Sequence, residues 1–354
     1  MSITFEEFIM KARDLNASDI HLTVGAPTVI RVNGELQRYM ENELSDQMIH
    51  RTIVNILSAE QEKMLMEGQD IDFSFELKNG NRQRVNVFRQ DGRLACAIRL
   101  LNSKIPSIGQ LGMPDIVLEF AKKRKGLVLV TGPTGAGKST TLAALIQYIN
   151  ETRACHIITI EDPIEYRYSQ YKATIHQREI GRDVPTFDYA LRSALREDPD
   201  VILIGEMRDY ETIMLALTAA ETGHLVFGTL HTSSAAQTVD RIVDVCPVES
   251  KEQVRSQLSN MIQGVISQTL VPTGDNKSRV AAVEIMVGTD AIKNLIRTNK
   301  VAQMETTMQG STSAGMMTLI DSLARLYRAG KINYQTALEY SNNPGEMEKK
   351  LNNG

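Results

Sequence analysis

The pattern of hydrophobic and polar positions changes between residues 102 and 114. Before this stretch, apolar and polar residues alternate in short runs, and Asn-Gly or Asp-Gly pairs separate several of them, at residues 33–34, 79–80 and 91–92. Alternation with a period of two is typical of strands with one buried face, and such pairs favour tight hairpins. Strands are therefore expected at 29–32, 72–77, 83–88 and 93–100.

Helices are expected at two places among these strands. Thr4 and Glu7 have the spacing of a capping box ahead of a short amphipathic helix, and the stretch between Ser45 and Gly68 favours helices that cover one face of the sheet. Residues 1–101 are thus predicted to form an α+β domain with an antiparallel sheet.

Beyond residue 114, runs of almost wholly apolar residues alternate with helix-forming stretches. The apolar runs are 127–130, 156–160, 201–204 and 225–230. Runs of this length indicate parallel strands that are covered on both faces. Helices are expected near 209–221, 251–268, 290–298, 316–329 and 333–340. The pattern predicts a doubly wound α/β domain over residues 115–341, followed by a flexible tail at 342–354.

Residues 102–114 are expected to link the two domains. They include Pro106, Gly109, Gly112 and Pro114, which interrupt both helices and strands. A chain of 354 residues is too long for one ordinary core, so two domains are expected on length alone.

Composition narrows the class of protein. The 42% hydrophobic and 23% charged residues are typical of a soluble globular protein. A net charge of -4 argues against general nucleic-acid binding. The acidic N-terminus and the lack of a long apolar run predict neither signal peptide nor membrane span, so any membrane association is expected to be indirect. Three widely spaced cysteines match no metal or redox pattern and favour a cytoplasmic location.

The strongest chemical signal is a phosphate-loop motif between an apolar run and a helix-forming stretch. It fits the pattern G-x-x-x-x-G-K-[ST] and consists of Gly132, Pro133, Thr134, Gly135, Ala136, Gly137, Lys138 and Ser139, with Thr140 beginning the helix. In this setting, backbone N–H groups and the helix N-terminus cradle phosphates, Lys138 reaches the β- and γ-phosphates, and Ser139 holds Mg²⁺. The motif predicts binding of a nucleoside triphosphate with Mg²⁺, and the family resemblance described below implies ATP.

Three side chains at strand ends are expected beside this loop. Glu206 follows the run 201–204, Glu161 follows 156–160, and His231 follows 225–230. The carboxyl ends of parallel strands meet at the edge where the phosphate loop lies. Glu206 is the candidate for the base that readies water, Glu161 for water-mediated contact with Mg²⁺, and His231 for a contact with the γ-phosphate. The competing interpretations are a surface carboxylate, an ordinary strand-ending turn and a structural histidine.

These segments together resemble the ATPases of secretion and type IV pilus systems. Beside the phosphate loop, or Walker A motif, three segments look like the family's Asp box, Walker B motif and His box: 160–166 (IEDPIEY), 203–209 (LIGEMRD) and 222–232 (TGHLVFGTLHT). Within the family, pilus retraction motors are the most similar, through 17–22 (ASDIHL), 191–200 (LRSALREDPD) and 291–297 (AIKNLIR). The resemblance covers nearly the whole chain.

The resemblance implies a PAS-like N-terminal domain, a RecA-like ATPase domain and a homohexamer that hydrolyses ATP to retract a type IV pilus. It implies that Glu206 is the catalytic glutamate and that Glu161 and His231 support the chemistry. It also implies that N-terminal arginines reach the nucleotide, the candidates being Arg82, Arg84 and Arg89. The sequence alone favours a solvated sheet face for Arg82 and Arg84. The expected partner is an inner-membrane platform protein, at the cytoplasmic face of that membrane.

Two positions depart from the family pattern. The family's C-terminal signature reads A-I-R-N-L-I-R-E, whereas this chain has Lys293 for the first arginine and Thr298 for the glutamate. Lysine lacks the bidentate fork of arginine, and threonine forms no ion pair, so the departure concerns coupling to retraction rather than ATP hydrolysis. The alternatives are a pilus extension or secretion ATPase, a nucleotide-dependent regulator without turnover, and a DNA-translocating motor.

Overall fold

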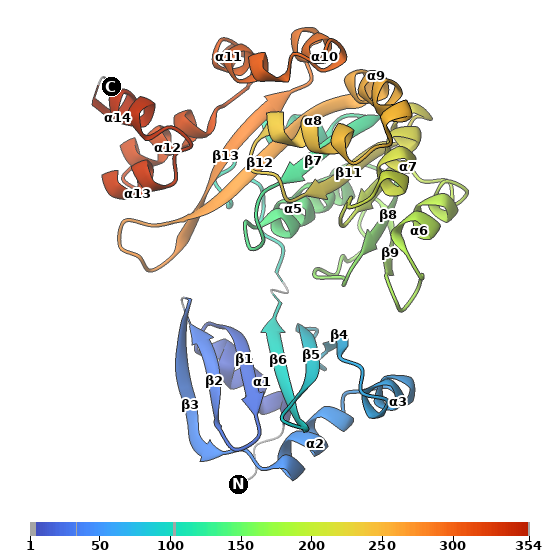
Figure 1. Ribbon diagram of the computed structural model, residues 1–354, viewed down its shortest axis with the longest axis vertical. Helices are drawn as coiled ribbons and strands as arrows, with labels where there is room; N and C mark the ends of the chain where they lie inside the picture. The colour runs from blue at the N-terminus through green and yellow to red at the C-terminus, as the bar shows by residue number, and fades with distance from the viewer. Residues whose placement is uncertain (1–4, 33, 102–103, 353–354) are drawn as a thin grey trace. The chain divides into compact units, whose positions relative to one another are not determined.

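The computed structural model describes residues 5–32, 34–101 and 104–352, and the chain divides into two compact units (Figure 1). The first consists of Met1–Lys104 and Glu165–Arg167, and the second of Ile105–Ile164 and Tyr168–Gly354. The main division therefore falls inside the Pro- and Gly-containing stretch 102–114.

The first unit contains a six-stranded sheet in the order β3-β2-β1-β6-β5-β4, with all neighbours antiparallel. Its strands are β1 Ala17–Thr23, β2 Pro27–Val32, β3 Glu35–Glu43, β4 Ile71–Glu76, β5 Arg82–Gln90 and β6 Arg93–Leu100. The predicted antiparallel sheet is confirmed. The three strands β4, β5 and β6 follow one another along the chain as a meander, as the turn pairs between them predict.

Three helices complete this unit: α1 Phe5–Asp14, α2 Asp46–Val54 and α3 Ala59–Met66. Thr4 of the expected first capping box lies outside the described residues, but Ser58 and Gln61 form a capping box that starts α3. The fully buried Ile9 of α1 and Ile49 of α2 share one core with Ile20 and Ile98 of the sheet. Helices and strands thus stabilise each other across one sheet face.

The second unit is built on a seven-stranded mixed sheet in the order β13-β12-β7-β11-β10-β8-β9 (Figure 1). All neighbours are parallel except the edge pair β12 and β13. The strands are β7 Gly126–Thr131, β8 His156–Glu161, β9 Thr174–Glu179, β10 Val201–Ile204, β11 Leu225–Leu230, β12 Ile262–Pro272 and β13 Arg279–Val287. The four predicted parallel strands are confirmed.

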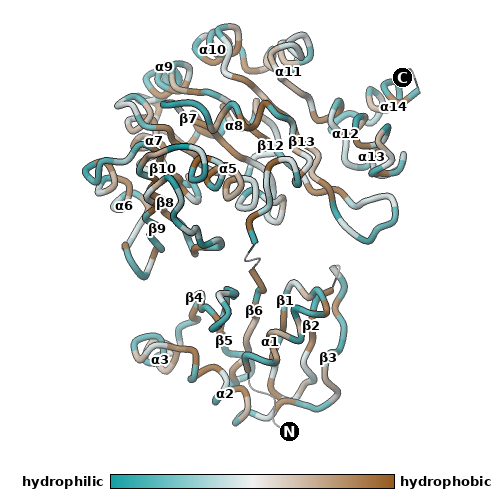
Figure 2. Tube along the Cα trace, turned by 180° about the vertical axis from the view of Figure 1, so that it is seen from behind, coloured by the Kyte–Doolittle hydropathy of each residue, from teal (hydrophilic) through white to brown (hydrophobic). Residues whose placement is uncertain are grey.

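Helices cover both faces of this sheet, and hydropathy along the trace is highest in the strands between them (Figure 2). Alternate residues of β7 pack on opposite faces, Leu127 and Leu129 in one core and Val128 and Val130 in the other. The helices are α4 Ile116–Ala121, α5 Lys138–Thr152, α6 Phe187–Ala194, α7 Tyr210–Glu221, α8 Ala235–Asp244, α9 Lys251–Met261, α10 Asp290–Arg297, α11 Met304–Gln309, α12 Leu319–Arg328, α13 Tyr334–Glu339 and α14 Pro344–Asn352. Burial on both faces explains why the strands read as continuous apolar runs.

The predicted helix at 251–268 is wrong beyond Met261, because the chain there becomes strand β12. A short apolar run that is buried on both sides has no periodicity that separates helix from strand. Val265 packs in one core and Ile266 in the other. At Gly264, an added Cβ would lie 2.3 Å from the Phe120 ring, so the strand needs a residue without a side chain there.

The prediction of a flexible tail at 342–354 is also wrong for its described part. Residues Pro344–Asn352 form α14, which packs against α12 in a small core of its own. Met347 is fully buried, and the Lys350 Nζ lies 2.6 Å from the Asp321 carboxylate. The polar composition of this stretch conceals the two apolar side chains that anchor it, the buried Met347 and the partly buried Leu351.

Candidate active site

The phosphate loop joins β7 to α5 as the motif predicts. Gly135 and Gly137 have φ angles of +80° and +87°, which favour glycine. Gly132 allows a close approach of backbone, because an added Cβ would lie 2.2 Å from the Gln268 carbonyl oxygen. The loop therefore presents bare backbone in front of the helix N-terminus, which fits a phosphate group.

Lys138 is held within the loop. Its Nζ donates hydrogen bonds to the carbonyl oxygens of Gly132 at 2.8 Å and Pro133 at 3.1 Å. The ammonium group thus lies beside the backbone cradle, where it can meet a phosphate oxygen with little movement. Ser139 and Thr140, in the first turn of α5, are both partly exposed.

Gln268 of β12 braces this loop, a role that the sequence did not predict. Its Nε2 donates to the Ala136 carbonyl oxygen, and its Oε1 accepts a hydrogen bond of 2.8 Å from the Thr141 hydroxyl. The side chain is 3% exposed. A glutamine within an apolar run is the signal that could have identified it, since a buried amide needs partners.

Glu206 and His231, which the sequence places on different strands, meet directly. The His231 Nε2 lies 3.1 Å from the Glu206 carboxylate, and the Arg208 guanidinium donates a hydrogen bond of 2.6 Å to the same carboxylate. The Glu206 side chain is 18% exposed. The parallel pairing of β7 with β11 and of β11 with β10 brings these residues to the edge that carries the phosphate loop.

The surroundings of Glu206 keep its carboxylate charged. Burial raises its pKa, but the hydrogen bond and charge of Arg208, with smaller contributions from His231, outweigh burial and leave the pKa below its ordinary value. The hydrogen bond to Glu206 in turn raises the pKa of Arg208, despite partial burial, with a further contribution from Asp162. A charged acceptor that is partly shielded from solvent is suited to orienting a water molecule.

Glu161 ends the next strand along the same edge, since Ile160 is paired with Ile204 of β10. Its carboxylate accepts hydrogen bonds from Thr159 at 2.6 Å and from Gln177 at 3.2 Å. The sheet thus brings Glu161, Glu206 and His231 to one edge, and Glu206 and His231 into contact.

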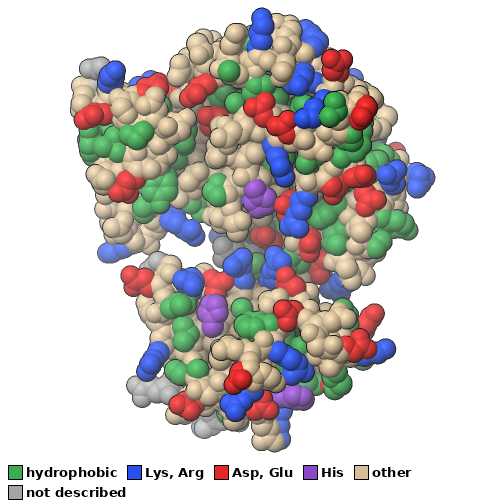
Figure 3. Space-filling view, in the orientation of Figure 1, with side chains coloured by type: hydrophobic (Ala, Val, Ile, Leu, Met, Phe, Trp, Pro, Cys, Tyr) green, Lys and Arg blue, Asp and Glu red, His purple; other side chains and the backbone are tan. Residues whose placement is uncertain are grey.

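The three candidate arginines lie on β5 of the first unit. Arg82 is 4% exposed, and it donates to the Ser74 hydroxyl and lies 4.0 Å from the Glu76 carboxylate. Arg84 forms a bidentate pair with Asp72, with bonds of 3.1 and 2.6 Å, and keeps 37% of its side chain exposed. Charged side chains of both signs occur over the face of each unit in Figure 3.

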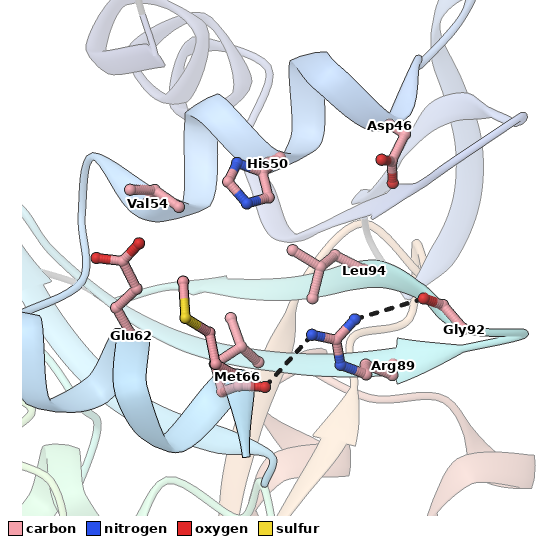
Figure 4. A pocket seen from close by; sticks show the side chains of 9 residues that line it. Asp46, His50, Val54, Glu62, Met66, Arg89, Gly92 and Leu94 are labelled. Carbon is pink, nitrogen blue, oxygen red and sulfur yellow. Dashed lines mark hydrogen bonds between the residues drawn. The ribbon is translucent and has the colours of Figure 1, made fainter. Parts of the chain in front are cut away.

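Arg89 lines a cavity of about 120 Å³ between α2, α3 and the turn from β5 to β6 (Figure 4). Its guanidinium donates hydrogen bonds of 3.4 Å to the carbonyl oxygens of Gly92 and Leu65. The lining residues are Asp46, His50, Val54, Glu62, Leu65, Met66, Arg89, Gly92 and Leu94. Arg89 therefore has local partners at the far end of the strand from Arg82.

The positions that depart from the expected signature lie on α10. Ile292, Leu295 and Ile296 are the buried residues of this helix, and Lys293 is partly exposed. Thr298 is the C-cap residue, and its hydroxyl donates a hydrogen bond of 2.8 Å to the Asn294 carbonyl oxygen. Threonine here closes the helix end instead of forming an ion pair.

Comparison with known proteins identifies the family. The model of the type II/IV secretion system protein family matches residues 2–337. The chain is 50% identical over 344 residues to the type IV pilus retractation ATPase PilT of Pseudomonas aeruginosa, covering 97% of this chain and 99% of that protein. It is 49% identical over 319 residues to a twitching motility protein of Neisseria gonorrhoeae, covering 90% of this chain and 85% of that protein. The chain belongs to the type II/IV secretion system protein family.

A solved structure agrees with this assignment. The crystal structure of the pilus retraction motor PilT with bound ADP superposes with a TM-score of 0.90 at 46% identity, covering 98% of this chain and all of that one. The predicted resemblance to secretion and type IV pilus ATPases is confirmed. Among the described residues, none of the helices is both long enough and apolar enough to span a membrane.

Proposed function

We propose that this chain hydrolyses ATP to power retraction of type IV pili. The observation that carries the proposal is the joining of Glu206 and His231 at the sheet edge that bears the phosphate loop. Full-length similarity to a pilus retraction ATPase and to a twitching motility protein supports the same activity.

In this proposal, each residue of the site has a definite task. Backbone N–H groups from Gly132 to Thr140 and the Lys138 ammonium bind the phosphates, and Ser139 would hold Mg²⁺. When bound, Mg²⁺ supplies positive charge at the β- and γ-phosphates. Glu206 orients the attacking water and accepts its proton, while His231 holds the Glu206 carboxylate in place and faces the γ-phosphate.

Glu161 is assigned a supporting role at the same edge. Its carboxylate is already oriented by Thr159 and Gln177, which suits it to hold a water of the Mg²⁺ shell. Because Asp162 also contributes to the charge balance of Arg208, this acidic segment and the Glu206 segment form one electrostatic unit. Loss of Glu161 is expected to lower turnover less than loss of Glu206.

The first unit is proposed to be a PAS-like domain and the second a RecA-like ATPase domain of a homohexamer. We assign Arg84, rather than Arg82, to contact the nucleotide, because Arg84 remains partly exposed whereas Arg82 is buried within the first unit. An arginine that arrives from another domain or subunit stabilises charge in the transition state, so turnover depends on closure of the ring. The proposed mechanical partner is a pilus platform protein at the cytoplasmic face of the inner membrane.

The alternative within the family is an ATPase for pilus extension or secretion. Deletion of the gene in the source cell separates the two, with pilus number as the measurement. Retraction predicts excess pili that persist, and extension predicts bald cells. Complementation with Glu206→Gln, matched for protein level, is expected to leave the deletion phenotype unchanged.

A regulator that binds ATP without turnover is tested with purified protein. Steady-state phosphate release from the wild-type chain is expected, and its absence in an assembled protein that binds ATP would favour the regulator. A DNA-translocating motor would instead show salt-dependent binding of single-stranded DNA.

A further inference from the structure

Glu284 is a buried carboxylate that the roles assigned above do not use. It lies on β13, 5% exposed, with its neighbour Met286 packed in the same core as Ala235 and Val239 of α8. Burial of a carboxylate is costly unless hydrogen bonds compensate for lost hydration. Its partners therefore indicate what the residue does.

The Glu284 carboxylate lies at the N-termini of two helices and is bonded to one of them. Its Oε1 accepts a hydrogen bond of 2.7 Å from the backbone N–H of Ala235, the first residue of α8. The backbone N–H of Leu319, the first residue of α12, is close enough to the same carboxylate to lower its pKa. Both N–H groups belong to the unpaired N–H groups of a helix start, where negative charge is favourable.

One of these helix starts is a short distance along the chain from the site. His231 follows β11, and only the three residues 232–234 separate it from Ala235. Thr232 is itself held, since its hydroxyl lies 2.7 Å from that of Thr238 on α8. The position of α8 therefore fixes the segment that presents His231 to Glu206.

The other helix start belongs to the C-terminal helices. Ile285, next to Glu284, exchanges two backbone hydrogen bonds with Met317, just before α12. Helix α12 packs with α13 and α14, and Lys350 of α14 pairs with Asp321 in the first turn of α12. Glu284 thus bonds to the helix behind His231, while its neighbour Ile285 ties the same strand to the helical end of the chain.

We propose that Glu284 is a positioning residue for ATP hydrolysis, which holds the His231 segment in register with Glu206 and links that segment to helices α12–α14. The inference rests on the proposed ATPase activity. The partner of Glu284 is outside the phosphate loop, so its loss is expected to act on the geometry of His231 and to leave that loop intact.

Two variants of Glu284 are expected to lower kcat to different degrees. Glu284→Leu removes the hydrogen bond to Ala235 and the carboxyl group beside Leu319. Because a misplacement of about 1 Å costs on the order of 10²-fold in rate, kcat is expected to fall by about that factor. Glu284→Gln keeps the shape and one oxygen acceptor but replaces the other oxygen with an NH₂ donor, and the weakening of about one hydrogen bond predicts a fall of about 10-fold. ATP affinity is expected to remain that of the wild type in both variants.

Ser322→Ala is the matched control. The Ser322 hydroxyl accepts a hydrogen bond of 2.9 Å from the Val283 N–H, so this variant weakens the same junction of β13 and α12 while keeping Glu284. Its kcat is expected to equal that of the wild type. A fall in kcat as large as that of Glu284→Leu would show that general loosening is responsible and overturn the proposal.

The decisive measurements are kcat for phosphate release, nucleotide affinity and hydrogen exchange at the Ala235 amide. Faster exchange at Ala235 with a lower kcat and unchanged affinity is the expected result in both Glu284 variants. Wild-type kcat in folded Glu284→Gln and Glu284→Leu would overturn the proposal, and if the leucine variant does not fold, wild-type kcat in the glutamine variant suffices. An inactive wild type would instead contradict the proposed function, and exchange at Ala235 would still test the hydrogen bond.

Discussion

The phosphate loop and Arg84 of β5 are held in place by different kinds of interaction. The loop is fixed by backbone geometry and by the neutral side chain of Gln268, both inside the second unit. Arg84 is instead held by the carboxylate of Asp72 at a half-exposed position. Neutral buried hydrogen bonds persist in salt, whereas exposed ion pairs are weak and screened. The loop is therefore held in the shape that fits a phosphate, while in the proposed function Arg84 would exchange its partner Asp72 for the nucleotide.

The largest expected effect comes from removing the Arg84 side chain. Arg84→Ala is expected to lower kcat on the order of 10³-fold, because an arginine that stabilises the transferring phosphoryl group contributes at least that much. Stability should change little, since exposed ion pairs contribute roughly 1 kcal/mol or less. Steady-state phosphate release on assembled protein measures the effect.

Asp72→Ala is the control for this prediction. It breaks the same ion pair but leaves Arg84 in place, so kcat is expected to be kept. Equal losses in the two variants would mean that the pair only stabilises the sheet. Arg82→Ala is expected to lower stability, because Arg82 is buried, and loss of turnover with intact folding would shift the assignment to Arg82.

The backbone geometry of the phosphate loop is tested at Gly132. Gly132→Ala is expected to weaken ATP binding by about 10²-fold, since the added Cβ would overlap the Gln268 carbonyl oxygen and shift the loop, and hydrogen bonds to charged groups such as phosphate contribute roughly 1.5–3 kcal/mol each. Gly135→Ala is matched to it, because no atom lies within 4 Å of an added Cβ there and only backbone strain is introduced. Titration with a fluorescent nucleotide separates the two, and equal affinities would contradict the close-packed loop.

Glu284 is the exception within the second unit, because it is a buried ionisable group. Burial raises its pKa from 4.5 to about 7, with a further contribution from the charge of Glu305 on α11. A raised pKa means that the folded state binds the proton more tightly than the unfolded state. The contribution of Glu284 to the free energy of unfolding is therefore complete at low pH and is lost as pH rises through 7.

The wild type is therefore expected to lose roughly 3 kcal/mol of stability relative to Glu284→Gln between about pH 4.5 and pH 7, at about 1.4 kcal/mol for each unit of pKa shift. Denaturant unfolding of the two proteins at both ends of this range measures the difference. Parallel pH profiles would show that the Glu284 carboxyl is not perturbed in the folded state.

The smallest effect is expected at Gln268. Gln268→Leu removes two hydrogen bonds but leaves the backbone of the loop, so a loss of about 10-fold in ATP affinity is expected. Thr141→Val removes only one of the two bonds and should give a smaller loss. Unchanged affinity in the leucine variant would mean that the glycines alone fix the loop.

The sequence predicted those parts of the molecule that depend on local pattern. The phosphate loop follows from a motif with a strand before it and a helix after it, and the placement of Glu206 and His231 at one sheet edge follows from the common edge of parallel strands, although their direct contact was not predicted. The antiparallel sheet of the first unit follows from period-two alternation and turn pairs. These signals act over a few residues, so a single sequence contains them in full.

The features that the sequence missed depend on distant partners. Ile262–Pro272 is a strand because it pairs with β7, and its apolar residues alone do not separate strand from helix. Gln268 and Glu284 acquire their roles from residues more than 40 positions away, at Ala136 and Ala235. Met347 anchors the expected tail in the same non-local way. Buried polar residues in apolar strands are the signals that a sequence does offer for such sites.

Glu206→Gln tests the central claim most directly, namely that the loop binds the triphosphate while Glu206 readies the water. The change keeps the size of the side chain and removes its charge, so ATP affinity should stay at the wild-type value while kcat falls by at least about 10²-fold. Nucleotide titration and phosphate release on the same preparation give both numbers. Turnover near that of the wild type would remove Glu206 from the chemistry and contradict the account.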